Sequence, residues 1–181
     1  GDSAGGHLSL SLAATLAETR PQSRPAAVLA LSPWVDTHIQ DLTHEGSSWQ
    51  RNQQLDYLGF ALGASPAVLI FGEGGHPLDN LLRLPPATAA AMPPMLVQVG
   101  SNEVLYDEIE LFCREGGLAP ERVQLEVYEG MMHVFQMFVG MEPTAIEALR
   151  SAGAFIQERA AVKHAVRAVD EVATVDTSLV K

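Results

Sequence analysis

The chain has 181 residues, of which 47% are hydrophobic and 18% charged, a balance typical of one soluble globular domain. The formal net charge of -11 argues against nucleic acid as a partner, because phosphate binding requires clustered lysine and arginine. The sequence contains no run of about 18 apolar residues, so we expect no membrane-spanning helix. The single cysteine, Cys113, excludes an internal disulfide and favours a reducing, cytoplasmic compartment.

The sequence also lacks two kinds of binding motif. It has no cluster of Cys or His residues at metal-binding spacing and no glycine-rich loop of the kind that holds phosphates. We therefore expect neither a metal nor a cofactor.

The chain opens on Gly1-Asp2-Ser3-Ala4-Gly5, a Gly-x-Ser-x-Gly motif. This motif is typical of a nucleophile elbow, a tight turn between a strand and a helix that exposes a serine hydroxyl. We expect Gly1 and Gly5 to be needed because side chains at these positions would clash in so tight a turn. Neither a Met nor the strand that leads into an elbow precedes Ser3, so we interpret the chain as the carboxyl-terminal part of a longer protein.

Helix and strand signals alternate along the chain, which favours an α/β fold with a mostly parallel sheet flanked by helices. Unbroken apolar runs bounded by Pro or Gly are typical of strands buried on both faces, whereas an alternating run is typical of an edge strand with one solvated face. Apolar residues at helical spacing indicate the helices. The predicted elements are helices at 7–18, 107–115 and 143–163, buried strands at 26–32 and 93–100, and an edge strand at 122–128.

The remaining segments carry weaker patterns. Between 36 and 84 we predict a helical or loop insertion, with short helices at 50–63 and 64–71. Residues 164–181 have no clear apolar stripe, and we interpret them as a tail that is frayed or disordered. The predicted organisation is therefore one catalytic region over 1–163, followed by this tail.

Three polar residues lie where the elbow and two predicted strands end. Ser3 is in the elbow, Glu103 follows the second predicted strand, and His133 follows the third. Because sites assemble at the carboxyl ends of parallel strands, we expect the three side chains to converge. The order Ser, acid, His is that of an α/β-hydrolase triad. In such a triad the imidazole accepts the serine proton, the carboxylate orients the imidazole, and the backbone N–H of Ala4 would donate to the oxyanion.

Four segments of the chain resemble the hormone-sensitive-lipase family of bacterial esterases, a branch of the α/β-hydrolases. They read GDSAGGHL from Gly1, LSPWVD from Leu31, GSNEVLYD from Gly100 and GMMHVF from Gly130. The resemblance extends from residue 1 to about residue 156, with a looser match over 37–92. It implies an α/β-hydrolase fold whose amino-terminal strands and cap are missing. It also implies a serine carboxylesterase that hydrolyses small-molecule esters with short acyl chains through an acyl-enzyme.

The same resemblance assigns roles to residues. It places the nucleophile at Ser3, the base at His133 and the acid at Glu103, where the family commonly has Asp. Asp107, four residues later, remains an alternative acid. The family's His-Gly-Gly-Gly oxyanion loop lies upstream of the serine and is absent from this sequence, so we expect the segment alone to be inactive.

Two alternatives stay open. A protein of hydrolase fold that binds a ligand without turnover is the alternative function, and a homodimer is the alternative to a monomer.

For the remaining candidate residues we favour a structural role over a functional one. Trp34 is expected in the core, Asp36 as a helix cap rather than a loop anchor, and Cys113 as buried rather than reactive. Four apolar residues near His133 could line an acyl tunnel, with ordinary packing as the default: Met131, Met132, Phe135 and Phe138. The remaining histidines are expected to be structural or solvated: His7, His38, His44, His76 and His164.

Overall fold

The computed structural model describes residues 1–38, 44–61 and 76–176, and the side chains within them except at 60–61 and 162–176. Its helices are α1 (Ser3–Thr19), α3 (Ser48–Asn52), α4 (Leu58–Ala61), α6 (Pro86–Ala91), α7 (Tyr106–Glu115) and α8 (Pro143–Asp176). Its strands are β1 (Val28–Leu31), β2 (Met95–Gly100) and β3 (Val123–Tyr128). Four short 3-10 helices complete the described elements: η1 (Pro21–Ser23), η2 (Leu81–Arg83), η3 (Pro120–Arg122) and η4 (Phe135–Phe138).

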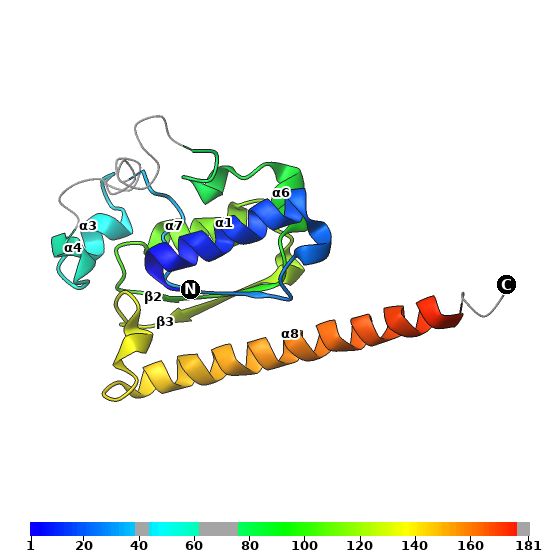
Figure 1. The fold of residues 1–181 in the computed structure, drawn as a ribbon. Helices are drawn as coiled ribbons and strands as arrows, with labels where there is room; N and C mark the ends of the chain where they lie inside the picture. Colours follow the sequence, from blue (N-terminus) through cyan, green and yellow to red (C-terminus); the bar gives the residue numbers. More distant parts are fainter. Residues whose placement is uncertain (39–43, 62–75, 177–181) are drawn as a thin grey trace.

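The three strands form a parallel sheet in the order β1-β2-β3. Helices α1 and α7 cover one face of this sheet and α8 lies along the other (Figure 1). Strand β2 is buried at every residue, and β3 lies at the edge of the described sheet with Gln124 and Val127 exposed. The predictions of a buried strand at 93–100 and of an edge strand at 122–128 are therefore confirmed, but the exposure along β3 does not follow the predicted alternation.

The first two residues extend the sheet beyond β1. Asp2 forms a parallel bridge with Leu31, the Gly1 amino group donates to the Leu29 carbonyl at 2.9 Å, and the Leu31 N–H donates to the Gly1 carbonyl at 3.0 Å. Four chain segments therefore reach the same edge of the sheet side by side, in the order 1–2, β1, β2 and β3. The residues that follow them are brought together at that edge.

The core lies between the sheet and the helices on the α1 side. Leu10 and Ala13 of α1 and Ile109 and Phe112 of α7 are fully buried or nearly so and pack with the inward residues of the strands. This packing explains why the helix predicted at 7–18 and the helix predicted at 107–115 both form. The first begins earlier than predicted, at Ser3, because the elbow turns directly into the helix.

The structure differs from the sequence prediction in three places. The insertion forms short helices, α3 and α4, where one helix was predicted over 50–63, and the predicted helix at 64–71 lies outside the described residues. Helix α6 was not predicted, although Pro86 at its start is a helix-initiation signal. Helix α8 continues past residue 163 to Asp176, where we predicted a tail, and no Gly or Pro after Gly153 interrupts it.

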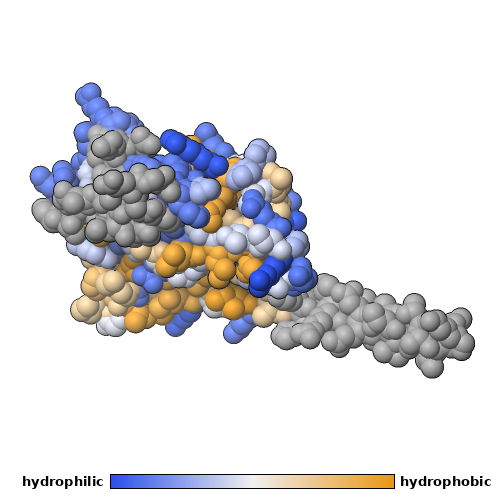
Figure 2. All heavy atoms as spheres, turned by 45° about the horizontal axis from the view of Figure 1, so that its top comes forward, coloured by the Kyte–Doolittle hydropathy of each residue, from blue (hydrophilic) through white to orange (hydrophobic). Residues whose placement is uncertain are grey.

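Apolar side chains remain at the surface of the described part. Figure 2 shows a broad apolar patch, coloured orange, on the face seen there. Large exposed apolar residues include Leu8 and Leu12 on α1 and Met137 and Met141 at η4. Patches of this kind are typical of surfaces that another segment or a partner covers. None of the described helices is both long enough and apolar enough to cross a bilayer.

Candidate active site

Ser3 has the backbone strain expected of a nucleophile elbow. It is the first residue of α1 and follows the bridge between Asp2 and Leu31, and its φ is 49°. A left-handed conformation at a residue other than glycine costs about 1–3 kcal/mol and persists only where the surroundings impose it. Here the Trp34 N–H donates to the Ser3 carbonyl at 3.1 Å and fixes that peptide. Ser3 therefore lies at a strand-to-helix turn of the kind that exposes a hydroxyl.

Of the two elbow glycines predicted to be needed because a side chain would clash, the structure supports one. A Cβ at Gly1 would lie 2.3 Å from the Gly5 carbonyl oxygen, so the prediction for Gly1 is confirmed. A Cβ at Gly5 would meet no atom of the described chain within 4 Å, so the prediction for Gly5 is wrong. The close approach belongs to Gly6 instead, where a Cβ would lie 2.9 Å from Pro33 because α1 packs directly against that loop.

Glu103 and His133 form a buried acid–base pair. His133 Nδ1 lies 3.2 Å from Glu103 Oε2, and the two side chains are 1% and 0% exposed. Since a carboxylate only accepts hydrogen bonds, the Nδ1–H donates and the lone pair is left on Nε2. This is the arrangement in which a carboxylate holds an imidazole in the tautomer of a general base.

The third member of the predicted relay, Ser3, lies at the same edge of the sheet as this pair but is not bonded to it. Within the described part of the chain, His133 Nε2 has no hydrogen-bond partner, so the bond from Ser3 Oγ to Nε2 is not formed in this structure. Catalytic hydrogen bonds of unliganded sites often form only when substrate binds. Ala4 lies in the first turn of α1, where backbone N–H groups have no acceptor within the helix.

Asp107, the alternative acid, has other partners. Its Oδ2 accepts the Ser48 N–H at 2.7 Å, and its Oδ1 lies 2.7 Å from Nη2 of Arg51. Both partners belong to α3. The structure thus uses Asp107 to attach α3 to the start of α7 and brings Glu103, not Asp107, to His133.

The turn that carries Glu103, residues 101–105, is called the acid turn below. The segment around α3 anchors it. Asn52 Nδ2 donates to the Glu103 carbonyl at 2.7 Å, and Asp56 Oδ2 accepts the Val104 N–H at 2.9 Å. Both Asn52 and Asp56 are buried. Sequence reasoning missed these two residues, because their partners lie far along the chain and no local pattern marks them.

Two further features surround the imidazole. The ring of Tyr57 meets that of His133 edge to face, with centroids 5.9 Å apart, and burial together with the nearby Asp56 raises the pKa of Tyr57. A hollow of about 410 Å³ lies beside the same loop. It is lined by Leu55, Gly130, Met131, Met132, Phe135, Phe138, Met141 and Glu142. The four residues for which we considered an acyl tunnel all border this hollow: Met131, Met132, Phe135 and Phe138.

The structure confirms the structural interpretation of Trp34, confirms that of Cys113 in part and corrects that of Asp36. Trp34 is 7% exposed and packs in the core. Cys113 is half-buried and packs against the core, and burial raises the pKa of its thiol to about 12, which disfavours the reactive thiolate near neutral pH. Asp36 is a loop anchor, not the helix cap that we favoured, because its carboxylate accepts the His38 N–H and the Asn80 side-chain amide.

The histidines divide between structural and surface roles. His7 is buried, and its two ring nitrogens lie 2.6 Å from the Trp34 carbonyl and 2.8 Å from the Leu78 carbonyl. His38 lies 3.1 Å from Asp79 at the surface. The side chain of His164 is outside the described part.

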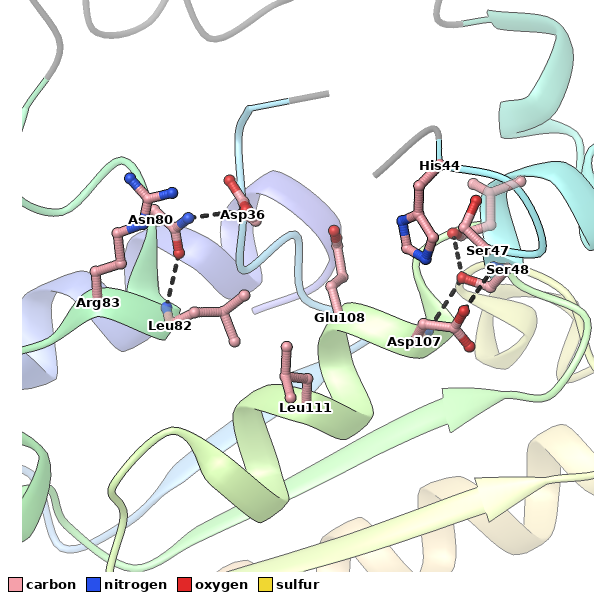
Figure 3. A pocket seen from close by; sticks show the side chains of 11 residues that line it. Asp36, His44, Ser47, Ser48, Asn80, Leu82, Arg83, Asp107, Glu108 and Leu111 are labelled. Carbon is pink, nitrogen blue, oxygen red and sulfur yellow. Dashed lines mark hydrogen bonds between the residues drawn. The ribbon is translucent and has the colours of Figure 1, made fainter. Parts of the chain in front are cut away.

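A second hollow, of about 350 Å³, lies between α7, the start of α3 and the segment around η2 (Figure 3). Its lining includes Asp36, Asn80, Val104, Asp107 and Glu108 but none of the three candidate triad residues. Glu108 is 5% exposed, and neither carboxylate oxygen has a hydrogen-bond partner within the described residues. Burial, reinforced by the carboxylates of Asp36 and Asp107, raises the pKa of Glu108 well above its usual range.

We expect Glu108→Gln to stabilise the protein at alkaline but not at acidic pH. A carboxyl whose pKa is raised in the folded state binds more protons folded than unfolded, so its stability contribution is lost as pH rises from its unfolded pKa through its folded one. Gln cannot ionise. The melting temperature of Glu108→Gln should match that of the wild type near pH 4, about the pKa of an unfolded glutamate, and exceed it by a few degrees at pH 8, corresponding to about 1–3 kcal/mol.

Glu115→Gln is the control, since Glu115 is exposed at the end of the same helix. An equal effect of Glu108→Gln at pH 4 and pH 8 would show that Glu108 does not titrate in this way.

Comparison with known proteins identifies relatives of the same architecture. A family profile described as alpha/beta hydrolase fold matches residues 1–137. An esterase from Acinetobacter venetianus is 32% identical over 161 residues, which are 86% of this chain and 50% of that protein. Esterase LipU from Mycobacterium tuberculosis is 32% identical over 168 residues, 87% of this chain and 53% of that protein. The chain thus spans about half the length of the curated relatives it matches.

Solved structures give the same result. A hormone-sensitive lipase from a metagenome library superimposes with a TM-score of 0.70 at 28% identity, covering 88% of this chain and 53% of that one. An esterase from the bacterial hormone-sensitive lipase family superimposes with a TM-score of 0.65 at 30% identity, covering 88% and 52%. The chain therefore belongs to the α/β-hydrolase family, in the branch that contains the bacterial esterases similar to hormone-sensitive lipase.

Proposed function

We propose that this chain is part of a serine carboxylesterase that hydrolyses small esters with short acyl chains. The observation that carries the proposal is the buried pair of Glu103 and His133, 3.2 Å apart, at the same sheet edge as the strained Ser3. The esterase names of the relatives support it. We also propose a cytoplasmic location, since the one cysteine, Cys113, is free and favours a reducing compartment.

The proposed reaction uses the triad in two steps. Ser3 Oγ attacks the ester carbonyl while His133 Nε2 takes its proton, and the N–H of Ala4 donates to the oxyanion. The imidazolium returns the proton to the leaving alcohol, which leaves an acyl group on Ser3. Water, deprotonated by His133, then releases the carboxylic acid and restores the serine. Glu103 holds the Nδ1–H throughout and stabilises the imidazolium.

The complete gene product should hydrolyse p-nitrophenyl esters, with the highest kcat/KM among the shorter chains in a series from acetate to laurate. With a slowly hydrolysed ester, mass spectrometry of the intact protein should detect one acyl group, and peptide mapping should place it on Ser3. Absence of hydrolysis across the series would reject the esterase proposal. A kcat/KM that rises steadily to laurate would reject only the preference for short chains.

A further inference from the structure

Ser32 joins the two halves of the acid–base pair. It follows β1, and its Oγ donates to Glu103 Oε1 at 2.7 Å and accepts the Val134 N–H at 3.0 Å. Its side chain is completely buried. A single hydroxyl thus connects the catalytic carboxylate to the peptide that directly follows His133.

The backbone around this hydroxyl is strained. Ser32 has a φ of 46° and Val134 a φ of 48°, and both values are costly for residues with a side chain. Apart from the elbow residue Ser3, they are the only residues other than glycine in the described part with positive φ. The N–H of Ser32 also donates to the Gln98 carbonyl at 2.7 Å. Strain at these positions persists only because the surrounding structure imposes it, as it does around functional sites.

The two oxygens of the Glu103 carboxylate have different hydrogen-bond partners. Its Oε1 accepts from the Ser32 hydroxyl and from the Gly100 N–H at 2.6 Å, which leaves Oε2 to face the His133 Nδ1–H. The terminal torsion of a glutamate is soft, so hydrogen bonds set the plane of its carboxylate. Removal of the hydroxyl leaves one of the two bonds to Oε1 and breaks the bridge between the Glu103 carboxylate and the Val134 N–H.

We propose that Ser32 is a positioning residue of the catalytic relay, which fixes the Glu103 carboxylate and the His133 backbone in one geometry. The proposal rests on the serine esterase function proposed above. Ser32 contacts no reacting atom in this scheme. It acts through Glu103 and His133, so its loss should affect the chemical steps more than substrate binding.

The test compares Ser32→Ala with Ser32→Gly in the complete gene product. Both variants lack the hydroxyl, but glycine adopts a φ near 46° without strain. We expect kcat to fall about 10- to 100-fold in both, with KM changed by no more than about threefold, as for a misplaced catalytic group. A kcat within twofold of the wild type in Ser32→Gly would overturn the proposal and leave only a backbone role for this position.

Ser151→Ala is the matched control. Its hydroxyl also donates to a glutamate, Glu126 Oε1, but from α8 and away from the catalytic edge of the sheet. It should lower the melting temperature without changing kcat. Proton NMR adds a readout that stability alone would not move: the His133 Nδ1–H signal should shift in both Ser32 variants and stay unchanged in Ser151→Ala. An unshifted signal in the Ser32 variants would also overturn the proposal.

The two proposals fail in different ways. If kcat is lost in Ser3→Ala but is unaffected in Ser32→Ala and Ser32→Gly, the esterase proposal stands. The proposed role of Ser32 is then rejected. A wild-type enzyme without esterase activity would reject the function and this inference together.

Discussion

Replacing Ser3 with alanine in the complete gene product will lower kcat for a p-nitrophenyl ester by about a millionfold, because the acyl-enzyme can no longer form. The structure makes Ser3 the residue to change. It has a φ of 49° at the junction of a sheet bridge and α1, and it lies at the sheet edge where Glu103 and His133 pair. Steady-state kinetics with both proteins purified identically measures the effect, and KM should change little.

Ser9→Ala provides the control for Ser3→Ala. Ser9 lies further along the same helix, where its hydroxyl donates to the Gly5 carbonyl at 2.9 Å, and it should keep wild-type kcat. A fluorophosphonate probe should label the wild type and Ser9→Ala but not Ser3→Ala. Retained hydrolysis in Ser3→Ala would refute the assignment of the nucleophile. A wild type that folds but is not labelled would instead support the ligand-binding alternative.

Local signals were enough to predict the elements that build the site. The runs at 26–32 and 93–100 are mostly apolar and bounded by Pro or Gly, and both became strands within two residues of the expected limits. The alternation at 122–128 correctly indicated an edge strand. Since polar residues at the ends of neighbouring parallel strands meet, the pairing of Glu103 with His133 followed from the order of the elements.

Long-range polar contacts could not be predicted from the sequence. Asn52 and Asp56 hold the acid turn from a segment with no clear periodicity, and Ser32 reaches a carboxylate and an N–H from elements distant in the chain. In the sequence, a serine directly before a proline is typical of an ordinary strand end, so nothing marked Ser32 as a residue with such contacts. The prediction for Gly5 failed for a related reason. Which side of α1 packs against the loop at Pro33 depends on the tertiary structure and not on the elbow motif.

Changing Glu103 to glutamine will lower kcat by about ten-thousandfold, close to the loss expected when a triad carboxylate becomes an amide. The amide is nearly isosteric, and its oxygen can still accept a hydrogen bond. Its NH₂ group, however, can face the Nδ1 side of His133, which favours the wrong tautomer and fails to stabilise the imidazolium. The pair is buried, at 0% and 1% exposure, so water cannot replace the lost charge.

Asp107→Asn separates the two candidate acids. Asp107 bonds Ser48 and Arg51 at the surface side of α7, and partly exposed pairs of this kind contribute about 0.2–1 kcal/mol. Its replacement should lower the melting temperature slightly and keep kcat within about tenfold of the wild type. If Asp107→Asn lost activity as severely as Glu103→Gln, or if Glu103→Gln remained active, the acid would have to be reassigned. Because Glu103 alone lies within hydrogen-bond distance of His133 Nδ1, we expect the large loss only there.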